Sequence, residues 1–274
     1  MVKLVAGPGG LDMADAGTYF DAILDATPTL ANSAKVEVSS PSGFSATVKG
    51  VGFTYDNPDE FPTDGLITSV RGGGAGLTSL SITDMALDVS DMRIWVPQGS
   101  PGYAQLANAV FGGADRIYGS RDASNTLSGL GGDDRIAGGA ENDRLGGDAG
   151  ADTLVGGRGR DQMTGGADAD AFVFGSTLDS RKASPDIIYQ ITDADRIDLR
   201  AIDANINKDG NQAFEIVDAF SHKASQITLS YDFNTYYTTI QLDVDGDAKS
   251  DMTILLDGLV GGFADHSNFT NFVL

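Results

Sequence analysis

Large apolar residues recur at every ninth position through the middle of the chain. They are Leu127, Ile136, Leu145, Leu154, Met163 and Phe172. Two positions before each stands an acidic or amide residue, and these are Asn125, Asp134, Asp143, Asp152, Asp161 and Asp170. Glycine-rich runs separate the units, which read GGxGxDxUx with U a large apolar residue. Because a strand alternates its faces, each D-x-U-x run predicts a short strand with U pointing inward, and each glycine-rich run predicts a turn.

Two such units form one coil of a parallel β-roll, so residues two units apart are expected to stack. One sheet then holds Leu127, Leu145 and Met163, and the other holds Ile136, Leu154 and Phe172. The polar residues form two edges, with Asp134, Asp152 and Asp170 on one and Asn125, Asp143 and Asp161 on the other. Asp115, with Ile117 two residues later, predicts a first, imperfect turn.

Columns of aspartates at the spacing of neighbouring strands would repel one another unless a cation lies between them. Calcium accepts about six to eight oxygens, drawn from carboxylates and backbone carbonyls. Glycine lets a turn adopt positive φ and aim its carbonyls inward. The alternative, a flexible glycine-rich linker, does not explain why the apolar residues keep their phase. The pattern therefore predicts several calcium ions in the turns.

The flanking regions show alternating patterns typical of strands. Before the repeats, strands are expected at residues 35–38, 44–55, 66–70, 77–82, 85–89 and 92–96, with turns that include 64–65 and 71–74. Short helices are expected at 13–26 and at 100–110, the second as a cap on the roll, and residues 1–12 as a frayed lead. After Phe174, strands are expected at 186–191, 196–202, 214–217, 226–231, 237–244 and 252–256.

The expected fold class is mainly β. A parallel β-roll of calcium-binding repeats is followed by a β-sandwich cap and preceded by a small antiparallel β domain with a short helix. The expected domains are residues 1–100, an N-terminal β domain; 101–174, the roll with its leading helix; and 175–274, the cap.

The charge and the missing cysteines narrow the function classes. The 274 residues carry a net charge of −21, which disfavours nucleic acid as a partner because binding it needs a basic surface. Cysteine is absent, so the fold has no disulfides. No apolar run reaches the length of a membrane span, and the start, MVKLVAGPGG, lacks the apolar core of a signal peptide. If the protein leaves the cell, we expect another export route.

The repeat unit is that of the calcium-binding RTX proteins, and residues from about 112 to 274 resemble the C-terminal region of serralysin-type secreted metalloproteases. The run from Asp195 to Asn205, DRIDLRAIDAN, is similar to that family's DKIDLSAIDAN segment. The resemblance implies a calcium-loaded parallel β-roll, a following β-sandwich and an uncleaved C-terminal signal for the type I secretion apparatus. It therefore implies a secreted, extracellular protein.

The resemblance also implies a set of calcium ligands. The carboxylates are Asp115, Asp134, Asp143, Asp152, Asp161 and Asp170, with Asp179 and Asp186 closing the last site and Asn125 as a neutral ligand in a weaker site. The carbonyls belong to the first four positions of each repeat. They are Gly129, Leu130, Gly131, Gly132, Gly138, Gly139, Ala140, Gly147, Ala149, Gly150, Gly156, Gly157, Arg158, Gly159, Gly165, Gly166 and Ala167. Glu141 and Asp168 replace glycine at position four, and we expect strained turns there.

The protease half of that family has no counterpart in this sequence. Its zinc site needs a helical HExxH, whereas the two histidines, His222 and His266, stand far apart and are expected on the surface. The sequence also has no GxSxG motif. No catalytic residue is therefore predicted.

A separate acidic run offers two interpretations. Asp243, Asp245, Asp247 and Asp251 form DxDGDxxxD, which resembles the start of an EF-hand loop but lacks its glutamate and its flanking helices. A hairpin turn and an extra calcium site both remain open.

Three functions follow from these observations. The leading hypothesis is a secreted, non-enzymatic protein whose roll folds on calcium outside the cell after type I secretion. The second is a secreted hydrolase or polysaccharide-modifying enzyme with an unrecognised centre in residues 13–100, where Asp56, Asp59 and Glu60 are candidates. The third is an adhesive or surface-layer module in residues 30–100 that binds a cell-surface or polysaccharide partner.

Overall fold

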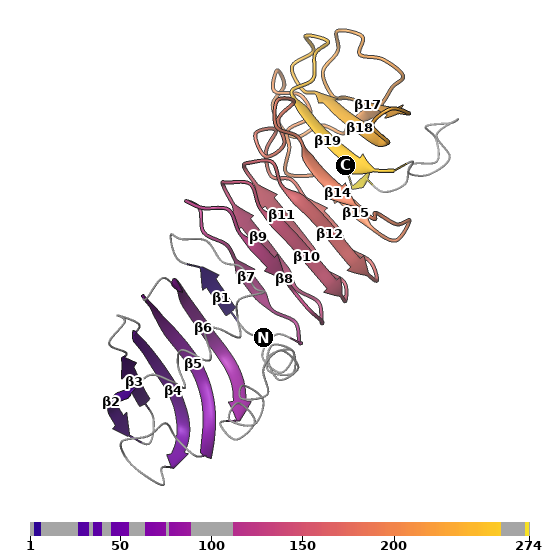
Figure 1. Cartoon of the computed structure of the whole chain (residues 1–274). Coiled ribbons are helices and arrows are strands. Elements are labelled where there is room, and N and C mark those ends of the chain that lie inside the picture. The colour runs from indigo at the N-terminus through magenta and orange to yellow at the C-terminus, as the bar shows by residue number, and fades with distance from the viewer. Residues whose placement is uncertain are drawn as a thin grey trace.

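The computed structural model describes residues 112–258 continuously. Outside that range it describes residues 3–6, 27–32, 35–39, 45–54, 64–74, 77–88 and 272–273. Every regular element within these residues is a β-strand, and the strands form two sheets, one of twelve strands and one of eight. Figure 1 shows the strands stacked side by side along one long axis. The mainly β fold with a parallel β-roll is confirmed.

The roll alternates between its two sheets at every repeat. The first sheet holds β7 (Arg116–Tyr118), β9 (Arg135–Gly139), β11 (Thr153–Gly157) and β13 (Ala171–Val173). The second sheet holds β8 (Thr126–Ser128), β10 (Arg144–Ala149) and β12 (Gln162–Ala167). All neighbouring pairs are parallel, as expected for a coil that returns in the same direction after each turn.

The apolar residues of the repeats form the core between the sheets. Leu145 pairs with Leu127 and with Met163 in the second sheet. Leu154 pairs with Ile136 and with Phe172 in the first. All six are buried, so both predicted stacks are confirmed. The register follows from the strand period, because a slip by one residue would turn every apolar side chain outward.

The strands after the roll continue both sheets. The second sheet is extended by β14 (Asp186–Tyr189), β19 (Met252–Asp257), β18 (Tyr237–Asp243), β17 (Gln226–Asp232) and β16 (Glu215–Ile216). The first is extended by β15 (Arg196–Asp198) and β20 (Phe272–Val273). Six of these strands lie at the expected positions, four of them (β14, β15, β16 and β18) shorter than expected, and β20 was not expected. Residues 199–202, for example, leave the strand after the ion pair between Asp198 and Arg200 (2.6 Å).

The N-terminal strands also belong to the first sheet. They are β1 (Lys3–Ala6), β2 (Thr27–Asn32), β3 (Lys35–Ser39), β4 (Ser45–Thr54), β5 (Asp64–Gly74) and β6 (Leu77–Asp88). Strands β2 to β6 pair antiparallel in sequence order. Strand β1 pairs antiparallel with β6 and parallel with β7, so the sheet runs without a break from these strands into the roll (Figure 1).

Several N-terminal expectations were wrong. Residues 3–6 are a paired strand rather than a frayed lead. The expected turns at 64–65 and 71–74 lie inside β5, where Gly72 pairs with both Ala46 and Leu80. Residues 77–82 and 85–89 were expected as two strands, but residues 77–88 form one. The pairing of β5 and β6 with each other and with their long neighbouring strands outweighs the local preference of these residues for turns. The expected helices at 13–26 and 100–110 and the strand at 92–96 lie outside the described residues.

Candidate metal centre

The aspartate of each repeat lies just before its strand and is buried. Asp134, Asp143, Asp152, Asp161 and Asp170 expose at most 3% of their surface. Each follows a glycine-rich turn and precedes the inward-pointing apolar residue by two positions. The alternation of the strand therefore directs the carboxylate inward, toward the turn, rather than to solvent.

One oxygen of each carboxylate joins successive coils. Asp152 Oδ1 accepts a hydrogen bond from the backbone N–H of Asp134 (2.8 Å), and Asp170 Oδ1 accepts one from Asp152 (2.9 Å). On the other edge, Asp161 Oδ1 accepts from Asp143 (2.8 Å). The partners lie eighteen residues apart, so both predicted aspartate columns are present. Asp115 begins the first column, with its N–H bonded to Asp134 Oδ1 (2.6 Å).

The other oxygen points into the turn and meets no donor. Oδ2 is buried without a hydrogen-bond partner in each of the five repeat aspartates Asp134, Asp143, Asp152, Asp161 and Asp170, and in Asp186. Buried polar atoms are almost always bonded, and each exception requires an explanation such as an ion. A row of buried acceptors with no donors is the arrangement that a cation would satisfy. The residues present therefore fit calcium, which binds oxygen ligands only.

The first glycine of each repeat keeps this space open. A Cβ at Gly129, Gly138, Gly147, Gly156 or Gly165 would overlap Oδ2 of the aspartate five residues later. At Gly147 the added atom would also lie 2.5 Å from the carbonyl oxygen of Gly165. At Gly129 it would lie 2.6 Å from that of Gly147. The carboxylate and the carbonyl of the next coil thus face one small space, a mixed oxygen set of the kind calcium uses.

Positive φ angles shape the turns at positions two and four. Position two has positive φ in all five repeats, from 69° at Leu130 to 141° at Gly139. Position four has it at Gly132, Gly150, Gly159 and Asp168, where φ is 73°. The expected strain is therefore present at Asp168, whereas Glu141 has no positive φ, so the strain expected there is absent.

Some predicted carbonyl ligands also link the turns. Ala149 O accepts from Gly132 N (2.8 Å), and Gly139 O accepts from Arg158 N (3.2 Å). Gly131 forms an isolated parallel bridge with Ala149. The other predicted carbonyls lie in the same stacked turns, in two rows that follow the two edges. Their role as calcium ligands stays a prediction.

Burial makes the carboxylates reluctant to ionise. Loss of water raises the pKa of Asp134 and Asp161 to about 7, and that of Asp152 and Asp170 to about 6. Burial also raises the pKa of Asp143. Backbone N–H groups lower these values and neighbouring carboxylates raise them, but desolvation dominates. The buried carboxylates are therefore favourable only when a proton or a cation offsets their charge.

The C-terminal end of one column is closed by two later aspartates. Asp186 lies 25 residues after Asp161, and its Oδ1 accepts from Asp161 N–H (2.9 Å), so it takes the next place in the column. Burial, with the charges of Asp161 and Asp179, raises the pKa of Asp186 to about 9. Asp179 itself accepts from Gly175 N (2.8 Å) and Ser176 N (3.0 Å). The structure thus brings Asp179 and Asp186, the two residues predicted to close this site, together with Asp161.

Sequence reasoning missed Asp195, which extends the opposite column. Its Oδ1 accepts from Asp170 N–H (2.9 Å), and its Oδ2 accepts from Thr192 N (2.7 Å). A signal was available, because Asp186 and Asp195 both begin D-x-U triplets and stand one repeat length apart. The loop between the roll and Asp186 interrupts the nine-residue spacing, and this makes the continuation of the pattern hard to recognise.

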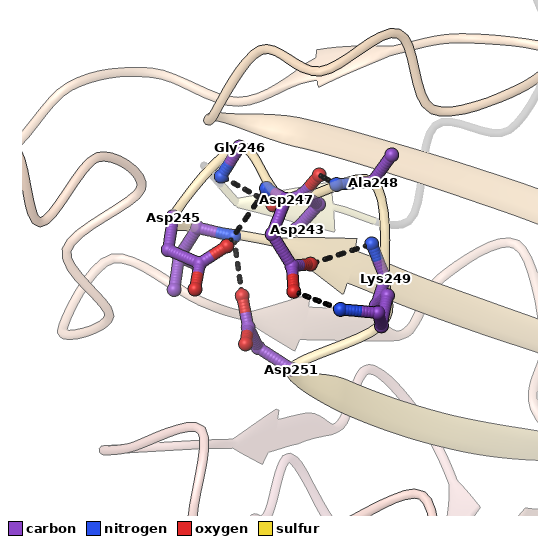
Figure 2. Close-up of polar contacts among 8 residues, drawn as sticks. Asp243, Asp245, Gly246, Asp247, Ala248, Lys249 and Asp251 are labelled. Atoms are coloured by element: carbon purple, nitrogen blue, oxygen red, sulfur yellow. Dashed lines mark hydrogen bonds and ion pairs between the residues drawn. The ribbon is translucent and has the colours of Figure 1, made fainter.

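The acidic run after β18 forms a hairpin turn. Figure 2 shows the carboxylates of Asp243, Asp245 and Asp247, which have oxygens within 4.8 Å of one another. The two oxygens of Asp243 accept from Gly246 N (2.6 Å) and Ala248 N (2.9 Å), and Asp247 forms an ion pair with Lys249 (2.6 Å). Asp251 Oδ2 accepts from Val244 N (2.8 Å). These bonds stabilise the turn, and an extra calcium site stays a prediction.

Two remaining expectations concern the surface. His222 is exposed, as expected, and His266 lies outside the described residues. Within the described part of the chain, no helix has the length and apolar character needed to cross a membrane.

Comparison with known proteins agrees with the resemblance seen in the sequence. Residues 112–270 match the family described as peptidase M10 serralysin C terminal. A segment of 87 residues, 31% of this chain, is 40% identical to the metalloprotease AprA of Pseudomonas entomophila strain L48. The match covers only 17% of that protease.

Two solved structures are also similar, both subunits of the mannuronan C5-epimerase AlgE6 of Azotobacter vinelandii. The R3 subunit is 25% identical, with 60% of this chain and 79% of that one covered and a TM-score of 0.33. The R2 subunit is 24% identical, with 54% and 81% covered and the same TM-score.

Protonation of the buried aspartates at lower pH is expected to substitute in part for calcium binding. An aspartate whose folded pKa is raised stabilises the fold fully below its unfolded value of 3.8, and this contribution is lost as pH rises through the folded value. In buffer freed of calcium on a chelating resin, the strand signal in circular dichroism should therefore be greater at about pH 5 than at about pH 8. An equal or smaller signal at the lower pH would contradict the buried, unpartnered carboxylates.

Filling the turn is expected to weaken the folded form. Gly147→Ala places a methyl group against Asp152 Oδ2 and the Gly165 carbonyl, which should cost roughly 1–3 kcal/mol and raise the calcium concentration needed for folding. Gly146→Ala is the matched control, because its nearest neighbours lie at 3.7 and 4.0 Å. Circular dichroism during a calcium titration gives the calcium concentration at half-maximal folding for both variants. Equal values for the two would contradict the predicted calcium site beside Asp152 Oδ2.

Proposed function

Because this chain belongs to the peptidase M10 serralysin C-terminal family, we propose that it is a secreted calcium-binding RTX protein whose β-roll folds when calcium binds outside the cell. The observation that carries this proposal is the row of buried aspartate oxygens without donors. They lie beside first-position glycines, around a space too small for a side chain, and at Gly129 and Gly147 a carbonyl oxygen of the next coil faces the same space.

Calcium would act here as part of the folded structure. It supplies positive charge that lets the buried carboxylates ionise, and the protein supplies the oxygens and holds them in place. The aspartates join each coil to the next through Oδ1, so an ion at Oδ2 would favour ordered coils on both sides. A ligand that binds only the folded form stabilises it by mass action. The roll should therefore be ordered where calcium is abundant and disordered where it is scarce.

Calcium-dependent folding can be tested on the full chain. We expect little strand signal in EGTA and a cooperative gain of strand as calcium is added, with magnesium much less effective because it demands a smaller octahedral site. Circular dichroism follows the change, and isothermal titration calorimetry counts the ions. The same strand content in EGTA and in excess calcium would contradict the proposal.

We further propose that the chain leaves the cell through a type I apparatus while still unfolded. The net charge of −21 favours an expanded chain at low cytosolic calcium, and a disordered chain can pass a narrow channel. External calcium would then drive folding. Residues 175–274 would carry the export signal as well as the cap.

Export should depend on the type I exporter. In cells that express the chain with and without a type I exporter, the protein should appear in the medium only in the first case. A cytosolic reporter protein in the same cells controls for lysis. Release into the medium without the exporter would contradict this route.

The other two functions rest on residues 1–100, whose candidate side chains lie outside the described residues. An enzyme centre in residues 13–100 and an adhesive module in residues 30–100 therefore stay predictions. The same holds for the division into three domains, and the first sheet runs continuously across the expected boundary near residue 100.

A further inference from the structure

Asn125 occupies the aspartate position of its repeat but presents a donor to the turn. Its Oδ1 accepts from the backbone N–H of Ser120 (2.9 Å). Its Nδ2 faces four oxygens, which are those of Ala123 O (2.9 Å), Ser120 O (3.1 Å), Gly138 O (3.2 Å) and Asp143 Oδ1 (2.8 Å). The amide nitrogen is thus surrounded by three carbonyls and one carboxylate oxygen.

The same place in the Asp134 and Asp152 turns holds two acceptors. Gly138 is the first residue of the repeat one coil after that of Asn125, and Gly147 and Gly165 stand in the same relation to Asp134 and Asp152. In those two turns the glycine carbonyl and the unpartnered Oδ2 flank one space. In the Asn125 turn, a Cβ at Gly119 would meet Gly138 O and lie 2.6 Å from Nδ2. An N–H donor therefore stands where the other turns have a second acceptor.

We propose that the Asn125 amide replaces a calcium ion, closing the first turn of its edge without metal. This inference rests on the proposed calcium function of the other turns. The amide links the oxygens of this turn to Gly138 and Asp143, a linkage that needs a cation wherever aspartate stands in its place. It also removes one negative charge from the end of the column beside Asp143. The first turn is then held independently of calcium and offers a fixed coil on which later coils can order.

Solvent reaches this turn, so an ion could enter if the donor were removed. A surface cavity of about 250 Å³ is lined by Asn125, Asp143 and Arg144, with Ser124, Thr126, Asn142, Arg160 and Gln162 around them. An aspartate at position 125 would point a carboxylate oxygen at the same three carbonyls and at Asp143. That set of oxygens would need a cation.

The test compares three variants of the full chain with the wild type. Asn125→Asp should bind one calcium ion more than the wild type and need a higher calcium concentration for half-maximal folding. Asn125→Ala should bind no additional ion but also fold at higher calcium, because its donors are lost. Asn142→Asp is the control. Asn142 is exposed on the same edge and its Oδ1 accepts from Arg160 N (2.8 Å), so the variant adds the same charge without altering the turn interior.

Calorimetry gives the number of ions and circular dichroism gives the calcium midpoint. The inference is overturned if Asn125→Asp binds the wild-type number of ions or does not fold in saturating calcium. It is also overturned if Asn125→Ala keeps the wild-type midpoint. A wild type that folds without binding calcium would instead refute the proposed function. In that case a lower urea midpoint for Asn125→Ala than for the wild type supports the amide closure, and an unchanged one refutes it.

Discussion

The hydrogen bond from the backbone N–H of one repeat aspartate to Oδ1 of the aspartate one coil later sets the geometry of the roll. It repeats along both edges and fixes the height of each coil. It also occupies one oxygen of each carboxylate and points the other oxygen toward a buried space that holds no hydrogen-bond donor. Leaving a buried acceptor unsatisfied is costly, so the ordered roll needs a proton, a cation or an amide at each of these positions.

Glycine meets two separate requirements in the turns. Position one has no room for a Cβ, because Oδ2 of the same repeat occupies that space, and it is glycine in all five repeats from 129 to 173. Positions two and four need positive φ, which other residues adopt at some energetic cost. Leu130, Asp148 and Asp168 do so. Steric exclusion at position one is therefore the stricter of the two constraints.

The two ends of the column that begins at Asn125 differ in chemistry from its middle. At one end the neutral amide of Asn125 stands in a column of carboxylates, and at the other Asp179 lies beside Asp161 and Asp186. The first sheet continues at both ends, through β1 toward the N-terminal strands and through β15 and β20 toward the C-terminus. Pairing of these neighbours covers edges that would otherwise be open to association.

The sequence by itself determined the two apolar stacks and the two aspartate columns, because a constant repeat and the alternating faces of a strand leave one register. It also located nearly all of the strands after the roll. Only the tertiary structure decided that residues 3–6 pair between β6 and β7, and that the Asn125 nitrogen faces four oxygens. The first feature depends on contacts between segments that are far apart in the chain and outside the repeats, and the second depends on which way one amide side chain is turned, so a local pattern cannot specify them.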